Sequence, residues 1–286
     1  MLKKMGKKMT LLLMIILAFS IVLTACGGEE PEGNGDKNTG QKGSSNGEKT
    51  VQDIKDAGKI ILGTSADYPP FEFHALVDGQ DEIVGFDIEI SKYIAEELGV
   101  DLEISDMDFD SLVTALGSER IDMAIAGMNP DPERDVNFTD IYYEANLAVL
   151  VMKDNPHNIE KEEDLKDKII GVQIGTTQED VANDVEAEEV VSLASNYDLV
   201  MNLKTEKINC AIMEKPVAES FAKANDDLIA VENLEIDSGT DGVAIAVKSG
   251  NDELTEKLNE ILAEIKSKGL IEEWLTKADE LSSEEI

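Results

Sequence analysis

The sequence contains few of the residues that most catalytic and metal sites use. It has two histidines, two cysteines and two arginines among 286 residues. Neither His74 nor His157 has a cysteine or a second histidine at the spacing of zinc ligands. It also lacks a glycine-rich phosphate loop, a dinucleotide-binding fingerprint and a nucleophile elbow. We therefore expect no metal site and no cofactor, and the motifs give no sign of catalysis.

Positive charge is scarce along the whole chain. The 25 basic residues stand against 61 acidic ones, so the formal net charge is −36. So acidic a protein repels nucleic acid and anionic lipid head groups, which excludes a nucleic-acid-binding function. An acidic exterior is typical of an extracellular protein that stays soluble in salty or alkaline surroundings, and it also attracts cationic solutes.

Residues 1–25 are predicted to be a targeting segment that is removed. Lysines at positions 3, 4, 7 and 8 precede an apolar run that is short for a membrane-spanning helix, which needs roughly 20 residues. The run ends in Leu23-Thr24-Ala25-Cys26, which resembles the lipobox of bacterial lipoproteins. The resemblance implies a lipid on Cys26. An uncleaved anchor helix is the alternative, and either would leave the rest of the chain outside the cell.

Residues 26–50 are predicted to form a flexible tether. They are rich in glycine, asparagine, lysine, glutamate and serine, and they show no apolar periodicity. At about 5–6 Å times the square root of its length, such a chain spans roughly 25–30 Å on average. After Cys26 only Cys210 remains, so no internal disulfide can form, and its apolar neighbours predict a buried core position.

From about residue 51 the sequence alternates between strand and helix patterns. We expect buried strands at residues 59–64, 102–104, 123–128, 146–152, 168–173, 190–192, 209–213 and 242–247. Helices are expected at residues 87–98 and 110–116, from about residues 177, 197 and 216, and over residues 252–275. This alternation indicates an α/β protein with mostly parallel sheets. About 230 residues are many for one sheet and suit two lobes.

Three segments stand out from this background. They are residues 64–73 with the following Gly85-Phe86-Asp87, residues 122–143 with Arg134, and residues 171–179 with Gly175-Thr176-Thr177. In order and spacing they resemble the polar amino-acid-binding proteins of ABC importers, solute-binding family 3. The resemblance covers nearly all of residues 51–275, including residues 214–218 and 242–248.

The resemblance implies a two-lobed periplasmic-binding-protein-like fold of type II, with two mostly parallel sheets joined by a two-strand hinge. Residues 51–143 and 238–286 would form the first lobe and residues 144–237 the second. A free polar amino acid would bind between the closing lobes. The closed form, expected to be a monomer, would dock on an ABC permease, while the lipid on Cys26 would hold it at the extracellular face of the cell membrane.

The main chain of a free amino acid needs donors for its carboxylate and a carboxylate for its ammonium. Arg134 matches the family position that grips the α-carboxylate, because a guanidinium offers two parallel donors. A salt bridge to a neighbouring acidic residue is the alternative. Thr177 opens a helix whose free amides favour an anion, and it is also an ordinary helix-start residue. Glu214 matches the aspartate that pairs with the ammonium, with a surface position as its alternative.

Four further residues match ligand-contacting positions of the family. Tyr68 and Phe109 match the aromatic pair that sandwiches the ligand side chain, and aromatic faces also attract a guanidinium. Core packing is the alternative for both. Gly127 and Asn129 match positions that touch the carboxylate and ammonium of the ligand. The family usually has threonine or serine where Asn129 stands, so its contact is left open.

The identity of the ligand depends on Ser65 and Glu72. Several family members have an aspartate at the position of Ser65, where it reads the ligand side chain, and arginine binders place Glu72 nearby. These two positions slightly favour a basic amino acid such as arginine or lysine, and a neutral polar one stays open. An enzyme on the same scaffold, similar to cyclohexadienyl dehydratases and using Glu214 as acid or base, and an amino-acid sensor are the alternative functions.

Overall fold

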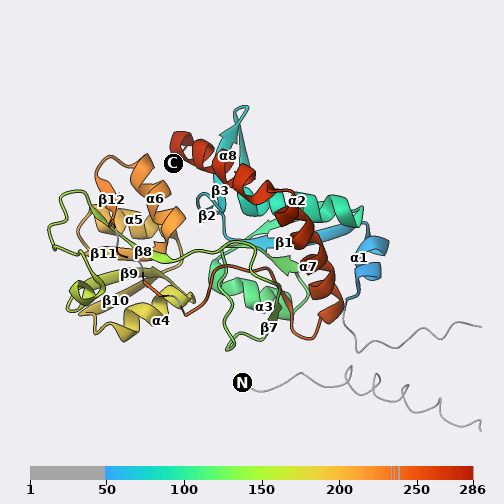
Figure 1. The fold of residues 1–286 in the computed structure, drawn as a ribbon, viewed down its shortest axis with the longest axis horizontal. Helices are drawn as coiled ribbons and strands as arrows, with labels where there is room; N and C mark the ends of the chain where they lie inside the picture. Colours follow the sequence, from blue (N-terminus) through green and yellow to red (C-terminus); the bar gives the residue numbers. More distant parts are fainter. Residues whose placement is uncertain (1–48, 233, 235, 238, 286) are drawn as a thin grey trace, which may run out of the picture. The chain divides into compact units, whose positions relative to one another are not determined.

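The computed structural model describes residues 49–286 except 233, 235, 238 and 286 (Figure 1). These residues belong to one compact unit, Ser45–Ile286. The predicted targeting segment, Cys26 and the tether as far as residue 48 lie outside the described residues. Among the helices that the structure describes, none is long and apolar enough to cross a membrane.

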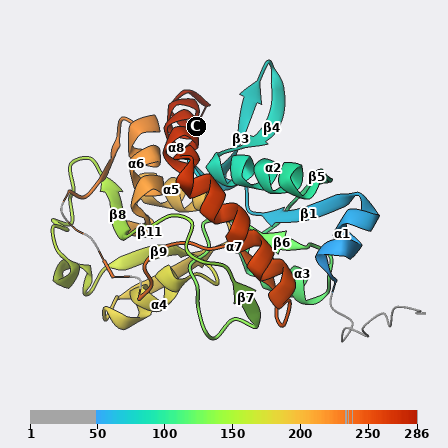
Figure 2. The ribbon, with the colours of Figure 1, turned by 45° about the vertical axis from the view of Figure 1, so that its right-hand side comes forward.

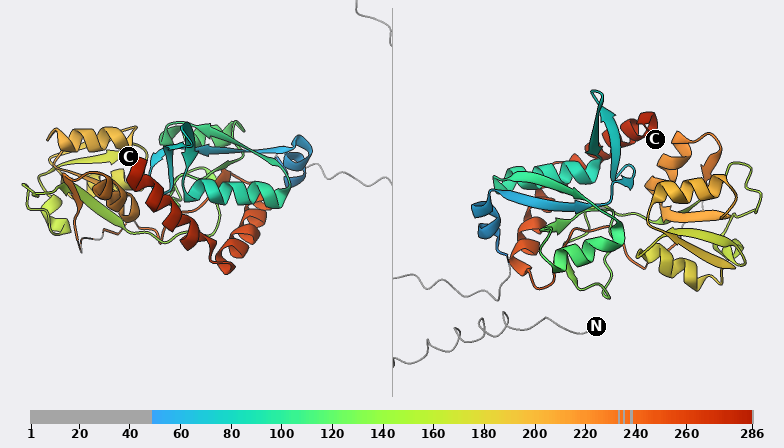
Figure 3. Two further views of the ribbon diagram at one scale, coloured as in Figure 1. Left: turned by 90° about the horizontal axis from the view of Figure 1, so that it is seen from above. Right: turned by 180° about the vertical axis from the view of Figure 1, so that it is seen from behind.

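The first lobe contains a five-stranded sheet of order β5-β1-β6-β13-β7. Strand β1 runs parallel to β5 and β6, whereas β13 runs antiparallel to β6 and β7. A smaller antiparallel sheet, β2-β3-β4, projects beside it (Figures 2 and 3). The strands are β1 (Lys59–Thr64), β2 (Asp67–Tyr68), β3 (Glu72–Val77), β4 (Gln80–Val84), β5 (Asp101–Asp106), β6 (Met123–Ala124), β7 (Val136–Phe138) and β13 (Ala246–Lys248).

The second lobe contains a five-stranded sheet of order β10-β9-β11-β8-β12. Its strands are β8 (Leu147–Met152), β9 (Ile169–Gln173), β10 (Glu189–Leu193), β11 (Cys210–Glu214) and β12 (Leu228–Ala230). Helix α4 (Thr177–Asp184) covers one face, and α5 (Asn196–Lys204) and α6 (Lys215–Ala224) cover the other (Figure 1). Both faces are therefore apolar, which explains why β8 reads as a continuous hydrophobic run. Cys210 is fully buried in this sheet, as predicted.

Both sheets are mixed, whereas the sequence pattern favoured mostly parallel ones. The exceptions, β8 and β13, are the strands that follow the two crossings between the lobes. Leu147 at the start of β8 pairs with Glu214 at the end of β11, and Ala246 at the start of β13 pairs with Ala124 at the end of β6. A strand that enters a sheet where the parallel strands finish must run in the opposite direction.

The two segments that cross between the lobes lie side by side. Tyr143 and Val243 form an antiparallel bridge, in which the N–H of Val243 donates to the carbonyl of Tyr143 at 2.9 Å. The backbones approach so closely at Gly242 that a Cβ there would lie 2.2 Å from the oxygen of Tyr143. Only glycine fits this position, so residue 242 fixes the spacing of the hinge.

The helices of the first lobe lie on both faces of its sheet. They are α1 (Val51–Ala57), α2 (Phe86–Leu98), the 3₁₀ turn η1 (Phe109–Ser111), α3 (Leu112–Gly117), α7 (Asp252–Ser267) and α8 (Leu270–Glu285); a second turn, η2 (Glu162–Leu165), belongs to the other lobe. We predicted one helix over residues 252–275, but Gly269 adopts a left-handed φ of 67° and separates α7 from α8. Helix α8 then packs against α2 and also against α6 of the second lobe (Figures 1 and 2).

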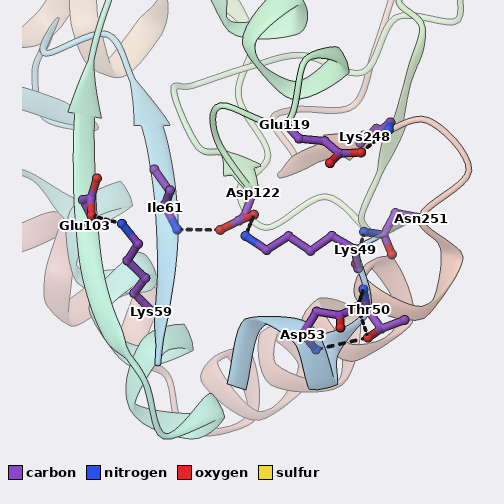
Figure 4. Close-up of polar contacts among 10 residues, drawn as sticks. All are labelled: Lys49, Thr50, Asp53, Lys59, Ile61, Glu103, Glu119, Asp122, Lys248 and Asn251. Carbon is purple, nitrogen blue, oxygen red and sulfur yellow. Dashed lines mark hydrogen bonds and ion pairs between the residues drawn. The ribbon is translucent and has the colours of Figure 1, made fainter. Parts of the chain in front are cut away.

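The N-terminal end of the described chain is fixed to the first lobe, although the sequence pattern assigned Lys49 and Thr50 to the tether. The Lys49 ammonium lies 2.6 Å from Asp122, whose other oxygen accepts the Ile61 N–H at 2.9 Å (Figure 4). Asn251 donates its side-chain amide to the Lys49 carbonyl at 2.9 Å, and Thr50 caps α1. The ordered body therefore begins at or before residue 49.

Replacing Asp122 by alanine should destabilise the first lobe. Its side chain is only 2% exposed, so the Ile61 amide would lose its acceptor inside the fold. Thermal or urea unfolding should show a loss of about 1–3 kcal/mol in the free energy of unfolding. The matched control is Glu103→Ala, because the Lys59–Glu103 pair is also 2.6 Å long but about half exposed. That variant should lose less than about 1 kcal/mol, and equal losses would contradict the prediction.

Candidate functional site

A small cavity lies between the two lobes, where strands from both sheets end. Its volume is about 10 Å³, close to the space that one water molecule needs. Ligands commonly bind beyond the carboxyl ends of the strands in α/β sheets, and β9 and β11 both end here. The cavity is lined by Tyr68, Phe109, Ala126, Gly127, Asn129, Arg134, Gln173, Thr176, Thr177, Gln178 and Glu214.

The guanidinium of Arg134 reaches across the cavity from the first lobe to the second. It donates to the carbonyl of Asn129 at 3.2 Å and to the carbonyl of Gly175, in the second lobe, at 3.0 Å. It also lies over the ring of Phe109, 5.4 Å from the ring centre. Asp131 is the only neighbouring acid that pairs with it among the described residues, through one 3.7 Å contact. Burial lowers the pKa of this guanidinium, and Asp131 opposes the shift.

The start of α4 supplies backbone donors from the second lobe. Thr177 is the first residue of the helix, and the first N–H groups of a helix have no acceptor within it. The Gly175 amide donates to the carboxylate of Glu179 at 2.8 Å and is therefore already paired. The residues that follow it in the helix start, Thr177 and Gln178, both line the cavity, so their amides are the donors available there. The positive end of the helix dipole therefore faces the same space as Arg134.

Asn129 uses its side chain to join the two lobes. Its Oδ1 accepts the Thr177 hydroxyl at 2.9 Å, and its Nδ2 donates to the carbonyl of Gly242 in the hinge at 3.1 Å. The side-chain amide therefore links the cavity, the hinge and the start of α4.

The ring of Tyr68, on the aromatic side of the cavity, packs against Gly127. The φ of Gly127 is +53°, and a Cβ there would lie 3.0 Å from two atoms of the Tyr68 ring, so only glycine fits well. Its N–H donates at 3.0 Å to Oδ2 of buried Asp87, which also accepts the Tyr142 hydroxyl at 2.8 Å. Burial raises the pKa of Asp87 to about 6, and these hydrogen bonds oppose the shift.

Glu214 is a carboxyl group without a partner. It ends β11, its side chain is fully buried, and neither of its oxygens has a hydrogen-bond donor among the described residues. Its backbone N–H donates to the hydroxyl of Tyr68, from the other lobe, at 3.1 Å. Burial raises the pKa of this carboxyl to about 8. An added cation would be strongly favoured here, because it would remove the cost of ionising a buried acid.

Two of the predicted site residues do not line the cavity. Ser65 is buried, 6% exposed, before β2, and Glu72 is fully buried in β3, where it is paired with Tyr68 of β2. Glu72 is fully buried although His74 and Leu76, which share its face of β3 by alternation, are exposed, and it does not border the cavity. Neither of its oxygens has a donor among the described residues, and burial together with the carboxyl of Asp87 raises its pKa well above the usual range.

The structure brings together seven of the nine predicted ligand-binding residues, namely Tyr68, Phe109, Gly127, Asn129, Arg134, Thr177 and Glu214. Four other lining residues, Ala126, Gln173, Thr176 and Gln178, were not among the predicted ligand-binding residues. All four lie within the motifs at residues 122–143 and 171–179, so the motifs located them without assigning them a contact. Within residues 49–286 as described, no cluster of histidine, cysteine or acidic side chains is arranged to hold a metal ion.

The raised pKa of Glu214 predicts a pH-dependent stability. Between its ordinary pKa of 4.5 and about 8, the unfolded chain ionises this carboxyl while the folded protein keeps the proton. The free energy of unfolding should therefore fall as pH rises through this range and stay level above it. Glu214→Gln removes the ionisation. The melting temperature of the ligand-free variant minus that of the unmodified protein should therefore increase by several degrees between pH 4.5 and pH 8. Exposed Glu219→Gln is the control, and a pH-independent difference for Glu214→Gln would contradict the assignment.

Comparison with known proteins identifies the family. The model of the bacterial extracellular solute-binding proteins, family 3, matches residues 60–278. The arginine-binding extracellular protein ArtP of Bacillus subtilis is 37% identical over 94% of this chain and 98% of its own length.

Two solved structures resemble the fold. One is an amino acid ABC transporter substrate-binding protein, AbpA, from Streptococcus pneumoniae bound to L-arginine, with a TM-score of 0.77 and 34% identity over 81% of this chain and 98% of that one. The other is an ancestral amino acid-binding protein, AncCDT-1, described as a precursor of cyclohexadienyl dehydratase, with a TM-score of 0.71 and 30% identity over 79% of this chain and 98% of that one. They confirm the two-lobed type II fold, here with mixed sheets. The chain is a binding protein and not an enzyme, and it belongs to family 3 of the bacterial extracellular solute-binding proteins.

Proposed function

We propose that this protein captures free L-arginine between its two lobes and delivers it to an ABC permease. The observation that carries the proposal is the pair of opposite charges that line the cavity: the guanidinium of Arg134 and the buried carboxyl group of Glu214, which has no donor among the described residues. The α-carboxylate and the α-ammonium of a free amino acid match these two groups. The rings of Tyr68 and Phe109, which also line the cavity, favour a cationic side chain.

In this proposal the main chain of the ligand lies between the lobes at their shared contacts. Arg134 and the free amides at Thr177 bind the α-carboxylate, because both are donors that face the cavity. Glu214 pairs with the α-ammonium, which would allow its buried carboxyl to ionise. Gly127 and Asn129 border the same groups and hold the first lobe in register with α4.

The ligand side chain is proposed to lie between Tyr68 and Phe109. Both rings line the cavity, and aromatic faces suit the planar guanidinium of arginine. Glu72 and Ser65 are buried behind this wall, with Glu72 paired to Tyr68 across the β2–β3 ladder. Neither residue borders the cavity, so the choice of a basic ligand rests on the two rings and on the relatives rather than on Glu72.

The relatives support arginine among the basic amino acids. The B. subtilis protein is named for arginine binding, and the S. pneumoniae protein has L-arginine bound. The same names support delivery to an ABC transporter. Ligand contacts from both lobes would favour the closed form, which is the form we expect the permease to recognise.

We further propose that a lipid on Cys26 holds the protein, as a monomer, at the extracellular face of the cell membrane. The lipobox-like Leu23-Thr24-Ala25-Cys26 supports this anchor, and the polar residues after it would supply a tether. The boundaries of the lobes, at residues 143/144 and 237/238, are part of the same proposal. The pairing of the crossing segments at Tyr143 and Val243 supports them.

Calorimetric titration with L-arginine, L-lysine and L-citrulline tests the proposed function. Citrulline has nearly the shape of arginine but no side-chain charge, so it should bind roughly 5- to 30-fold more weakly, because it loses the cation–π attraction to Tyr68 and Phe109. Arg134→Ala and Arg134→Lys should each lose at least about 100-fold in arginine affinity, because lysine cannot donate bidentately.

The control for these variants is Arg120→Ala, which removes the other arginine of the chain, an exposed one. It should bind arginine as the unmodified protein does. Unchanged affinity in Arg134→Ala would show that the carboxylate binds elsewhere. Failure of the unmodified protein to bind L-arginine, or equal affinity for citrulline, would contradict the proposed ligand.

A further inference from the structure

Outside the cavity, the two lobes are also joined at Asp67. This residue is in β2 of the first lobe, directly before Tyr68. Its carboxylate accepts the backbone N–H of Asn196 at 2.7 Å and the side-chain amide of Asn196 at 3.0 Å. Asn196 is the first residue of α5 in the second lobe and is 1% exposed. Asp67 does not line the cavity.

These hydrogen bonds complete the start of α5. A helix needs acceptors for its first N–H groups, and the residue before the helix usually supplies one from its own side chain. Ser195 occupies that position, but its side chain caps no backbone N–H of the helix. Asp67 supplies the acceptor from the opposite lobe, and its negative charge suits the positive end of the helix.

The contact desolvates a charged group. Burial raises the pKa of the Asp67 carboxyl, and the hydrogen bonds from Asn196 oppose that shift. When the lobes separate, the carboxylate and the first amides of α5 return to water together. The contact can therefore form only in the closed protein, and its contribution belongs entirely to the closed state.

We propose that Asp67 is a positioning residue that caps α5 across the cleft and so sets how long the closed protein retains its ligand. Because Asp67 does not border the cavity, the cap stabilises the closed state equally for every ligand that fits. It changes the fraction of protein that is closed, and thus the apparent affinity, without changing the preference among ligands. The affinity measurement rests on the proposed function, since it uses L-arginine as the probe.

Stopped-flow measurement of arginine release tests this role. Asp67→Ala should dissociate about tenfold faster, the typical effect of removing a helix cap, while the association rate changes by less than about twofold. The ratio of the dissociation rates for arginine and lysine should stay as in the unmodified protein. The dissociation rate of Asp67→Asn should lie between those of the unmodified protein and Asp67→Ala, because its amide oxygen can still accept the Asn196 N–H.

The matched control is Glu97→Ala, which changes the net charge equally at an exposed position on α2. It should release arginine at the unmodified rate. Hydrogen exchange of the peptide that contains the start of α5 gives a second readout. Arginine should protect these amides in the unmodified protein and in Glu97→Ala, but much less in Asp67→Ala.

Two outcomes separate this inference from the proposed function. If Asp67→Ala releases arginine at the same rate as Glu97→Ala, and arginine protects the amides of α5 equally in both variants, the inference is wrong even though arginine binds. If the unmodified protein does not bind arginine, the proposed ligand is wrong. In that case the exchange comparison is repeated with the free amino acid that most raises the melting temperature of the unmodified protein. Protection of the start of α5 in Glu97→Ala but not in Asp67→Ala would support the cap, and equal protection would overturn it.

Discussion

The buried carboxyl group of Glu214 is the point around which the two lobes meet. It has no donor among the described residues, although an ionised acid removed from water needs a cation. Its own amide donates to Tyr68 of the other lobe, so the residue belongs to the interlobe contact as well as to the cavity. Burial keeps a proton on this group near neutral pH. In the proposed complex a cationic ligand would replace that proton, which would couple the charge of the ligand to lobe closure.

The sheet topology delivers the other parts of the site to the same place. β9 and β11 finish at the cavity, and the segments that cross between the lobes start β8 and β13 at that end. Backbone is therefore crowded there, which explains the glycines at positions 127 and 242. The contacts then divide into two groups. Those inside the cavity, led by Arg134, would contact the ligand in the proposed complex, and the contact of Asp67 with α5 lies outside it, where we propose that it acts on closure alone.

The sequence predicts the cavity residues Arg134, Thr177 and Glu214 because they lie in motifs that resemble those of the family. They come from separate segments, and the structure brings all three together. The sequence does not predict features that depend on contacts between distant parts of the chain. The directions of β8 and β13, the strands that follow the two crossings between the lobes, depend on the end at which the chain enters each sheet. Glu72 is in a motif that implies a ligand contact, but it is buried outside the cavity lining. Asp67 and its partner are 129 positions apart, so no local pattern joins them.

Proton release on binding tests the coupling at Glu214 most directly. L-arginine would be titrated calorimetrically at pH 7 in buffers that differ in ionisation enthalpy. A group with a pKa of about 8 holds roughly 0.9 proton at this pH, so binding should release protons, and Glu214→Gln should release roughly one fewer per arginine bound. Equal binding heats in every buffer, or the same release from Glu214→Gln, would contradict the account.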